Sequence, residues 1–509
     1  MAVTAFLPAL GSFAHLYATK DRRRRIACND VNVASNLLRR TTPIGRFSGL
    51  SQTPASLSQP SFFLLLTGSS PLTPSELAGR LDGLVRSDGS KYWRLSCGVT
   101  PDWCNFVLPS REGEGSLSSV IRPTFHPTAP VGRIEVLETM SNFLTTPLPP
   151  PPPSSPSPYP KQLQALLSSG VLGASGVLPP AAREKAREEG RDWETIVYLR
   201  SHHVLADGVS LAGILSDVSD QREEIREQVR AAVKERKQKR SNSRLSNLLK
   251  RLIKSLAWLV GGMIVAGIEH IKTVLSTRHS PFLLPSSSSS SSRHGPPLPG
   301  RALSYVTGLD LEEVKSIARS HGVTINDLIV HSVSQAVSSL PTHNPKSSST
   351  KVLLPVHLTG GVVLDGSSLG NRIGGVSVCV SSGDTPSDTA RKLSKVKAGP
   401  MVLLSHVGAR VASAVLPGSL GPRALEIAAG NAAVAVTNVR GPSDTLTLGG
   451  RKIESVLGFV PPPTGVPIGV VVSSMAGEMA ITVNADPIVV RDPDLFLGNI
   501  VGNVYRLRK

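Results

Sequence analysis

The chain has few cysteines, and this shortage limits what it can be. Only 4 Cys occur in 509 residues, and they are scattered along the chain at Cys28, Cys97, Cys104 and Cys379. Such a small and dispersed set cannot form a disulfide framework, so we expect a reducing compartment or a cytosol-facing protein. Cys97 and Cys104 are separated by six residues without a second pair, a spacing that does not suit zinc.

Aromatic residues are also scarce, at 4% of the chain, whereas basic residues are in large excess. The net charge is +18, and residues 222–254 alone carry 12 Lys or Arg against 4 Asp or Glu. Basic patches of this kind attract polyanions, either nucleic acid or anionic lipid headgroups. No aromatic stacking platform, zinc finger or RNA-recognition signature accompanies the basic residues. We therefore expect no nucleic-acid partner and favour a lipid surface.

The length of the chain exceeds what one ordinary core accommodates, so we expect two packed subdomains. Hydrophobic residues make up 40%, which suffices for two cores, while 45 Gly and 41 Pro indicate extensive loops. Residues 1–60 are expected to be a non-core extension, either a disordered tail or an organelle transit peptide. A secretory signal is disfavoured, because the basic run Arg22–Arg25 follows the apolar segment instead of preceding it.

Residues 61–220 are predicted to form the N-terminal subdomain, beginning with an apolar strand at Phe62–Thr67. Thr73-Pro74-Ser75-Glu76 then provides an N-cap, a Pro at the first helical position and a capping-box Glu. A helix through Leu77, Leu81 and Leu84 should follow, which gives an α/β opening. Residues 147–160 are proline-rich and should form loop or polyproline structure, and residues 147–192 as a whole are interpreted as an insertion. A further strand is predicted at Trp193–Ser201.

Residues 221–300 are predicted to contain a basic amphipathic helix followed by a Ser/Pro linker. Apolar residues recur with helical spacing over residues 245–271, and Lys250, Arg251 and Lys254 lie between them. The uncharged part, Leu256–Ile268, has 13 residues, whereas a membrane-spanning helix needs roughly 20. The helix therefore suits a membrane interface, or alternatively packs on the protein's own core. The serine tract at residues 286–292 is a linker.

Residues 301–509 are predicted to form the second subdomain, which should contain both helices and strands. Helices are expected at 309–320 and 326–340. Strands are expected at 351–357, 373–380, 432–437 and 481–484. The fold class is thus mixed α/β (α+β).

The candidate chemistry lies in the run His202-His203-Val204-Leu205-Ala206-Asp207-Gly208, directly after the predicted strand at 193–201. Histidine has an ordinary pKa near 6.5 and suits proton transfer at neutral pH. A strand that ends at His203 would fix its ring, and Asp207 would hold the local backbone or a basic partner. Gly208 is expected to permit a tight turn. The same residues also suit a capped turn without catalytic function.

A metal site formed by His202, His203 and Asp207 is disfavoured, because adjacent residues of a strand point to opposite faces. We therefore expect no metal and no bound cofactor.

The run at 202–208 resembles the active-site signature of the wax ester synthase/diacylglycerol acyltransferase family, within the chloramphenicol-acetyltransferase-like superfamily. Further landmarks resemble those of the family and occur in its order over roughly 62–505. They are Thr324-Ile325-Asn326-Asp327, Leu354-Pro355-Val356, Leu369-Gly370-Asn371-Arg372, Thr437-Asn438-Val439-Arg440-Gly441-Pro442 and Asn484-Ala485-Asp486. Individually, each also has a local structural interpretation; Asn326, for example, would simply cap the helix that follows it.

The resemblance implies two chloramphenicol-acetyltransferase-like subdomains with a substrate tunnel between them. It implies an O-acyltransferase that uses acyl-CoA to esterify a long-chain fatty alcohol or diacylglycerol, with His203 as general base in a ternary complex. Asp207 would assist His203, with His202, Gly208, Asn326, Asp327 and Asn438 in support. The expected location is the cytosolic face of the endoplasmic reticulum or a lipid droplet, or a plastid if the first 60 residues are a transit peptide.

The chain also departs from the family pattern. The family's Pro-Leu-Trp segment before the histidine strand is replaced by the proline-rich stretch. Two alternative functions follow: a superfamily acyltransferase with a soluble acceptor, and a catalytically silent protein that binds lipid surfaces. The Asp-Phe-Gly-Trp-Gly motif of plant phenolic acyltransferases is absent, as is any adjoining carrier domain of the kind that accompanies condensation domains.

Overall fold

The computed structural model describes residues 38–53, 56–87, 89–109, 116–123, 132–150, 159–241, 261, 280–283, 300–358, 369–398, 400–415 and 420–508. Three predictions concern other residues. The tail up to residue 37, nearly all of the amphipathic helix at 245–271 and the serine tract at 286–292 lie outside the described residues.

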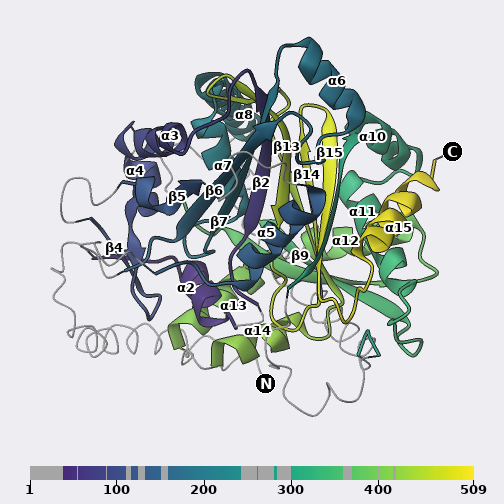
Figure 1. The fold of residues 1–509 in the computed structure, drawn as a ribbon. Helices are drawn as coiled ribbons and strands as arrows, with labels where there is room; N and C mark the ends of the chain where they lie inside the picture. Colours follow the sequence, from purple (N-terminus) through teal and green to yellow (C-terminus); the bar gives the residue numbers. More distant parts are fainter. Residues whose placement is uncertain are drawn as a thin grey trace.

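The N-terminal lobe is built on a six-stranded sheet with the strand order β12-β13-β2-β7-β6-β5. Its strands are β2 (Ser61–Gly68), β5 (Ile121–Pro123), β6 (Leu163–Val171), β7 (Trp193–Ser201), β12 (Thr447–Leu448) and β13 (Arg451–Phe459). Its helices are α3 (Pro74–Ser87), α4 (Gly89–Tyr92), α5 (Arg133–Thr145), α6 (Pro180–Glu188), α7 (Gly208–Val218) and α8 (Arg222–Ser241). Two short 3-10 helices, Trp93–Ser96 and Ser118–Val120, complete the lobe. Figure 1 shows β2, β6 and β7 side by side, with α3 and α4 to one side.

The C-terminal lobe is built on a second six-stranded sheet with the order β10-β9-β11-β14-β15-β8. Its strands are β8 (Ala302–Asp310), β9 (Ser349–His357), β10 (Ile373–Ser381), β11 (Val434–Arg440), β14 (Ile468–Met475) and β15 (Glu478–Ala485). Its helices are α10 (Leu311–Ser320), α11 (Ile325–Ser338), α12 (Pro386–Ala398), α13 (Met401–Val415), α14 (Gly421–Ala429) and α15 (Pro493–Tyr505).

The elements predicted from hydrophobic periodicity are confirmed. The strand β2 and the helix α3 occur where they were expected, and Leu77, Leu81 and Leu84 of α3 are buried. The capping box is present, because the Thr73 amide donates to Glu76 Oε2 at 2.8 Å and the Glu76 amide donates to Thr73 Oγ1 at 3.2 Å. The two helices and four strands predicted for residues 301–509 also form. The mixed α/β fold class is therefore confirmed.

The interpretation of residues 147–192 as an insertion is wrong for much of this stretch. Strand β6 pairs with β7 in an unbroken antiparallel register from Leu163–Ser201 to Val171–Trp193. It lies inside the sheet between β7 and β5, and its side chains Leu163, Ala165 and Leu167 are buried. The described residues 147–150 form neither helix nor strand, as expected for the proline-rich stretch.

The C-terminal half of the chain contributes two strands to the N-terminal sheet, which places the lobe boundary differently from the predicted division at residue 300. After β11 the chain leaves the second sheet and forms the hairpin β12–β13 beside β2. It then returns as β14, which pairs in parallel with β11. The C-terminal half of the chain therefore contributes strands to both lobes. Across the lobe boundary, β13 packs against β14 and β15.

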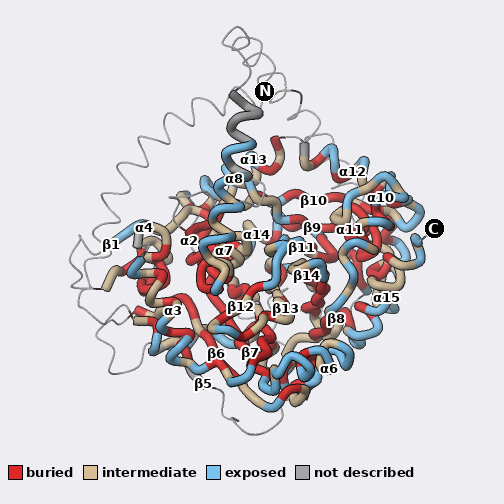
Figure 2. Tube along the Cα trace, turned by 90° about the horizontal axis from the view of Figure 1, so that it is seen from above, coloured by how far each residue is buried: buried red, intermediate tan, exposed pale blue. Residues whose placement is uncertain are grey.

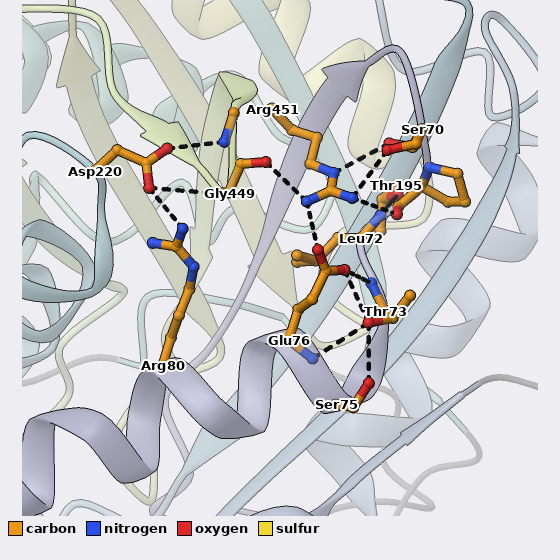
Figure 3. Close-up of polar contacts among 12 residues, drawn as sticks. Ser70, Leu72, Thr73, Ser75, Glu76, Arg80, Thr195, Asp220, Gly449 and Arg451 are labelled. Carbon is orange, nitrogen blue, oxygen red and sulfur yellow. Dashed lines mark hydrogen bonds and ion pairs between the residues drawn. The ribbon is translucent and has the colours of Figure 1, made fainter.

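A polar network fixes this hairpin to the N-terminal lobe (Figure 3). The guanidinium of Arg451 donates to Glu76 Oε1 at 2.9 Å, to the Ser70 hydroxyl at 3.0 Å and to the carbonyls of Ser70, Pro71 and Gly449. Asp220 accepts from the amides of Gly449 and Gly450 and pairs with Arg80 at 2.7 Å. These bonds join α3, the connection between α7 and α8, and the crossing hairpin.

The prediction that residues up to 60 lie outside the core is wrong for the part that the structure describes. A small sheet of β1 (Leu38–Arg40), β4 (Asn105–Val107) and β3 (Gly98–Val99) begins the described chain. Helix α2 (Pro43–Leu50) follows, with Thr42 as N-cap and Pro43 as its first residue. Helix α2 packs against α13 of the other lobe.

Hydrophobic clusters cover both faces of the N-terminal sheet and extend across the lobe boundary. One cluster joins this sheet to α3 and α7, and another joins its opposite face to α5 and to Leu303, Tyr305 and Ala480 of the second sheet. Buried segments therefore run through both lobes in Figure 2. Within the described residues, no single helix is long and apolar enough to span a bilayer; Pro386–Lys397 and Met401–Val415 satisfy that test only as a pair bent by 51°.

Candidate active site

His203 lies in a turn that directly follows strand β7, at the junction of the two lobes. The turn is closed by a hydrogen bond from the Leu205 amide to the His202 carbonyl at 2.9 Å. The His203 amide donates to the Ser58 carbonyl at 2.9 Å, and its carbonyl accepts from Asn371 Nδ2 at 2.5 Å. The backbone of His203 is thus hydrogen-bonded to both halves of the chain. These bonds fix the backbone position from which the imidazole extends.

One ring nitrogen of His203 lacks a hydrogen-bond partner. Its Nδ1 is buried and makes no hydrogen bond of normal geometry, and Asn371 Oδ1 is likewise buried without a partner. Burial lowers the pKa of His203, while the charge of Asp207, the side chain of Asn371 and the backbone of Ala206 act in the opposite direction. The net shift is downward, so the ring is neutral at pH 7 and able to accept a proton.

His202 is a structural residue. Its ring stacks on Trp103 with 4.2 Å between ring centroids and an interplanar angle of 19°. Its Nδ1 accepts from the Val204 amide at 3.0 Å, and its Nε2 lies 3.3 Å from Gln52 Oε1. Burial lowers the pKa of His202 to about 3, so it stays neutral. With both ring nitrogens occupied, His202 does not join His203 and Asp207 in a metal site.

Asp207 anchors the histidine turn and does not contact the imidazole by a hydrogen bond. It is the N-cap of α7, with Oδ1 accepting from the Ser210 amide at 2.9 Å. Its Oδ2 accepts from the Arg372 amide at 2.8 Å and lies 3.5 Å from His357 Nε2. Burial acts to raise the pKa of Asp207, but hydrogen bonds from His357, Arg372 and Ser210 lower it overall. The expectation that Asp207 holds the local backbone is therefore confirmed.

The loop at 369–372 is the partner of the histidine turn in the other half of the chain. The Asp207 amide and the Ser210 hydroxyl both donate to the Gly370 carbonyl, at 3.1 and 3.0 Å. Asn371 hydrogen-bonds to the His203 carbonyl, and the Arg372 amide hydrogen-bonds to Asp207 Oδ2. The sequence pattern marks residues 369–372 as a landmark but does not predict their contact with His203, and no sequence signal indicates His357.

A buried cation lies next to this loop. The guanidinium of Arg94 packs over the rings of Trp93 and Phe106, and its Nε and Nη1 have no hydrogen-bond partner. Burial and the neighbouring charge of Arg372 lower the pKa of Arg94 to about 10, so it remains charged at neutral pH. The loop at 369–372 therefore borders a positively charged region.

Helix α2 packs against the histidine turn and Trp103, and two glycines allow this close contact. A Cβ at Gly45 would lie 2.9 Å from the Val204 carbonyl oxygen, and one at Gly49 would lie 2.3 Å from the Trp103 ring. Because both contacts are too short for a real Cβ, only glycine permits this packing. The Thr42-Pro43 start signal and the four-residue spacing of the glycines were the available sequence signals for α2.

An apolar pocket of about 970 Å³, part of it open to solvent, lies between the two lobes, and Gly208 at the start of α7 lines it. The N-terminal lobe contributes one face of α7, from Gly208 to Leu215, together with β2 and β13. The C-terminal lobe contributes β8, β11, β14 and β15, including Val439 and Met475. The tight turn lies at residues 202–205, whereas Gly208 begins α7 without a positive φ, so the expectation that Gly208 permits the turn is wrong. Its missing side chain instead leaves room between α7 and Val439.

The remaining predicted site residues lie away from His203 in the contacts that the structure describes. Thr324, and not Asn326, caps α11, and Asp327 completes the capping box and lies 3.8 Å from Lys397. Asn326 is thus an ordinary residue of the first helical turn. Asn438 is exposed on β11, adjacent to the pocket residue Val439. Asn484 is buried and joins Arg301 to the Val460 carbonyl at the lobe boundary.

Several solved structures have a similar fold. The wax ester synthase/diacylglycerol acyltransferase from Marinobacter aquaeolei VT8 matches with a TM-score of 0.52 and 12% identity, over 92% of this chain and 98% of that one. The trichothecene 15-O-acetyltransferase from Fusarium sporotrichioides matches with a TM-score of 0.58 and 14% identity, over 93% and 95%. The first condensation domain of the CDA synthetase matches with a TM-score of 0.51 and 14% identity, over 93% and 97%. These likenesses confirm the two-lobed chloramphenicol-acetyltransferase-like fold.

A comparison with curated protein sequences gave no match. Sequence profiles of a protein family do match. The profile of the wax ester synthase/diacylglycerol acyltransferase catalytic domain matches residues 190–329, and the profile of the WS/DGAT C-terminal domain matches residues 369–507. The two matches include the histidine turn, the loop at 369–372 and β11, and together they extend over more than half of the chain. The chain is therefore an acyltransferase that belongs to the wax ester synthase/diacylglycerol acyltransferase family.

Proposed function

We propose that the protein transfers a long-chain acyl group from acyl-CoA to the hydroxyl of a fatty alcohol or diacylglycerol, with His203 as the general base. The observation that supports this most directly is a neutral histidine whose buried Nδ1 has no hydrogen-bond partner, in the turn that leads to Gly208 in the lining of an apolar pocket between the lobes. An apolar pocket of this size suits the hydrocarbon chain of a lipid substrate.

In the proposed reaction, both substrates bind before chemistry begins. The imidazole of His203 takes the proton of the acceptor hydroxyl while its oxygen attacks the thioester carbonyl carbon. The tetrahedral intermediate collapses by breaking the carbon–sulfur bond. The thiolate of CoA then takes the proton from the imidazolium, which yields the ester, free CoA and neutral His203. General-base catalysis of this kind contributes roughly 10²–10⁴-fold, and holding both substrates in place contributes further.

The electrostatics near His203 support an anionic acyl donor. Arg372 belongs to the loop at 369–372, Arg94 lies beside that loop, and the chain carries a net charge of +18. Because CoA carries several phosphate charges, a positive region next to the histidine turn favours its approach. Asp207 would act by holding the turn and α7 in place.

The test is a product profile from the purified protein supplied with labelled palmitoyl-CoA and one acceptor at a time. Hexadecanol and dipalmitoylglycerol are the lipid acceptors, and a short-chain alcohol represents the soluble class. We expect wax ester or triacylglycerol as the main product. Ester formation with the soluble alcohol alone would support the alternative acyltransferase, and no ester with any acceptor would support the catalytically silent protein.

The pocket can be tested separately by narrowing it. Ala212 lines the pocket on α7, so Ala212→Phe should reduce the rate with palmitoyl-CoA by about tenfold or more and spare butanoyl-CoA. Ala231→Phe, at an exposed position of α8, is the matched control and should change neither rate. Equal loss with both donors in Ala212→Phe would show that the acyl chain does not occupy this pocket.

A further inference from the structure

Exposed aliphatic side chains are concentrated on α13 and α14. The described residues contain 13 exposed large hydrophobic side chains, and seven of them lie between residues 403 and 427. We call these seven the α13–α14 face: Leu403, Leu404, Val407, Val411, Val415, Leu420 and Ile427. Isolated exposed apolar residues are normal on a soluble surface, but a contiguous cluster marks an interaction site.

The α13–α14 face is one side of an amphipathic arrangement. Leu403, Val407, Val411 and Val415 follow one another at intervals of four residues, which places them in one row along α13. Val402 and Ser413 on the opposite side of the helix are buried, where α13 packs on β10 and α2. Figure 1 shows α2, α13 and α14 together at the lower edge of the molecule.

Basic residues are in excess near this face. Residues 386–430 contain six Lys or Arg and two Asp or Glu. Four of these cations form ion pairs, namely Arg391, Lys392, Lys397 and Arg423, whereas the exposed Lys395 and Arg410 form none among the described residues. Aliphatic side chains bordered by Lys and Arg are the composition that binds the interface of anionic lipid layers. A second copy of the chain is a poor partner, because two such faces would bring like charges together.

The α13–α14 face is also coupled to the histidine turn. His406 Nδ1 of α13 contacts the Ile373 carbonyl at 2.8 Å, and the Gly375 amide donates to Ser405 Oγ at 2.9 Å. Ile373 lies two residues after Asn371, which binds His203. On the other side, Arg46 of α2 donates to the Ser413 carbonyl at 2.7 Å, and Gly45 of α2 packs on Val204. Only α2 and the start of β10 therefore separate α13 from the histidine turn.

We propose that the α13–α14 face docks the protein onto the surface of an anionic phospholipid layer, close to the point where lipid substrates reach His203. The choice of a lipid surface rests on the proposed function, since a lipid acyltransferase must draw its water-insoluble substrates from such a layer. The docking itself does not require catalysis and can be measured without it.

The experiment is flotation of the purified full chain with vesicles of phosphatidylcholine alone or mixed in equal parts with phosphatidylserine. The test variant is Leu403→Ser/Val407→Ser/Val411→Ser. The matched control is Ile134→Ser/Val171→Ser/Leu495→Ser, three exposed apolar residues on α5, β6 and α15. We expect the wild type and the control to bind the mixed vesicles, and the test variant to bind at least about tenfold more weakly. Equal binding of all three proteins would overturn the proposal.

A second variant keeps the apolar residues and changes the charge. Lys395→Glu/Arg410→Glu should weaken binding to the mixed vesicles and leave any binding to phosphatidylcholine alone unchanged. This variant decides the matter if the serine variant fails to fold. If wild-type protein forms dimers that the serine substitutions dissolve, without binding either vesicle, the face is an interface between two copies and the proposal is wrong.

Activity measurements separate this inference from the proposed function. With butanoyl-CoA and a soluble alcohol, the serine variant should react as fast as the wild type, whereas with vesicle-embedded diacylglycerol it should be at least about tenfold slower. If the wild type binds vesicles but forms no ester, the proposed function fails and the docking surface stands. If the wild type forms ester and the serine variant is unimpaired on vesicles, the docking surface fails alone.

Discussion

The side-chain amide of Asn371 donates a 2.5 Å hydrogen bond to the backbone carbonyl of His203 and thereby ties the C-terminal half of the chain to the histidine turn. The same side chain lies close enough to the imidazole to raise its pKa against the lowering effect of burial. Asn371 is thus a positioning residue, because it acts on the reaction through His203.

Replacing Asn371 tests this role through the pH profile. His203 must be neutral to act as a base, so activity should fall only when the pH drops below its lowered pKa, on the acid side of 6.5. Asn371→Ala should reduce kcat by roughly tenfold or more and move this acid limb to lower pH. Asn371→Asp adds a negative charge and should move the limb to higher pH. Identical pH profiles in all three proteins would show that Asn371 does not influence His203.

The structure explains why the sequence indicated His203 but not its surroundings. The strand β7 and the motif at 202–208 are contiguous, so their pattern is visible in one short stretch. Asn371 and Ser58 reach His203 only through long-range folding, and α2 approaches the neighbouring Val204 and Trp103 through glycines that carry no hydrophobic signal. The family landmarks gave the order of these segments along the chain and not their contacts.

Other errors have equally specific causes. Strand β6 contains two serines and a glycine near its end and follows a proline-rich stretch, so its local sequence resembles a loop. The hairpin β12–β13 is not among the predicted strands, and no local pattern shows which sheet it joins. Its position is fixed by partners such as Glu76 and Asp220, more than 200 residues away in the sequence. Register and partner choice of this kind are set by tertiary contacts.

A second prediction concerns Asp207 as an anchor. Asp207→Asn removes the negative charge next to His357. It also replaces one carboxylate oxygen, which accepts from a backbone amide, by an NH2 group that can only donate. We expect a loss of about 2–3 kcal/mol in the free energy of unfolding, measured by chemical denaturation, together with low activity. Asp310→Asn is the control, because that exposed N-cap of α10 tolerates either residue. An unchanged free energy of unfolding in Asp207→Asn would contradict the anchoring role.

The crossing hairpin gives a third prediction. Arg451→Met keeps most of the side-chain volume but removes five hydrogen bonds around a guanidinium that is only 10% exposed. We expect the free energy of unfolding to fall by about 2–4 kcal/mol. Arg391→Met removes an ion pair whose side chains are 69% and 36% exposed, and should cost about 0.5 kcal/mol or less. Equal effects of the two substitutions would mean that the hairpin does not depend on Arg451.

The fourth prediction is a pH dependence of stability caused by His202. Burial lowers its pKa to about 3 in the folded chain, whereas an unfolded histidine titrates near 6.5. Between these values the unfolded chain binds more protons, so stability is complete above pH 6.5 and declines as the pH falls below it. The decline due to His202 should be about 1.4 kcal/mol per pH unit.

His202→Asn tests this point, because the Asn carbonyl can replace Nδ1 as acceptor for the Val204 amide without titrating. Denaturation curves between pH 5 and 7 should show a shallower loss of stability in the variant than in the wild type. His203 shifts in the same direction and contributes equally to both proteins. Parallel curves would show that His202 does not set this dependence.

The central claim is that His203 is the general base, and single-turnover ester formation with labelled palmitoyl-CoA tests it most directly. The acceptor is the alcohol or glyceride that the wild type prefers. His321→Ala, at a histidine whose ring contacts the Leu507 carbonyl in the C-terminal lobe, serves as the control. We expect His203→Ala to lower the rate by about 10²–10⁴-fold while the control keeps the wild-type rate. Undiminished ester formation by folded His203→Ala would contradict the assignment.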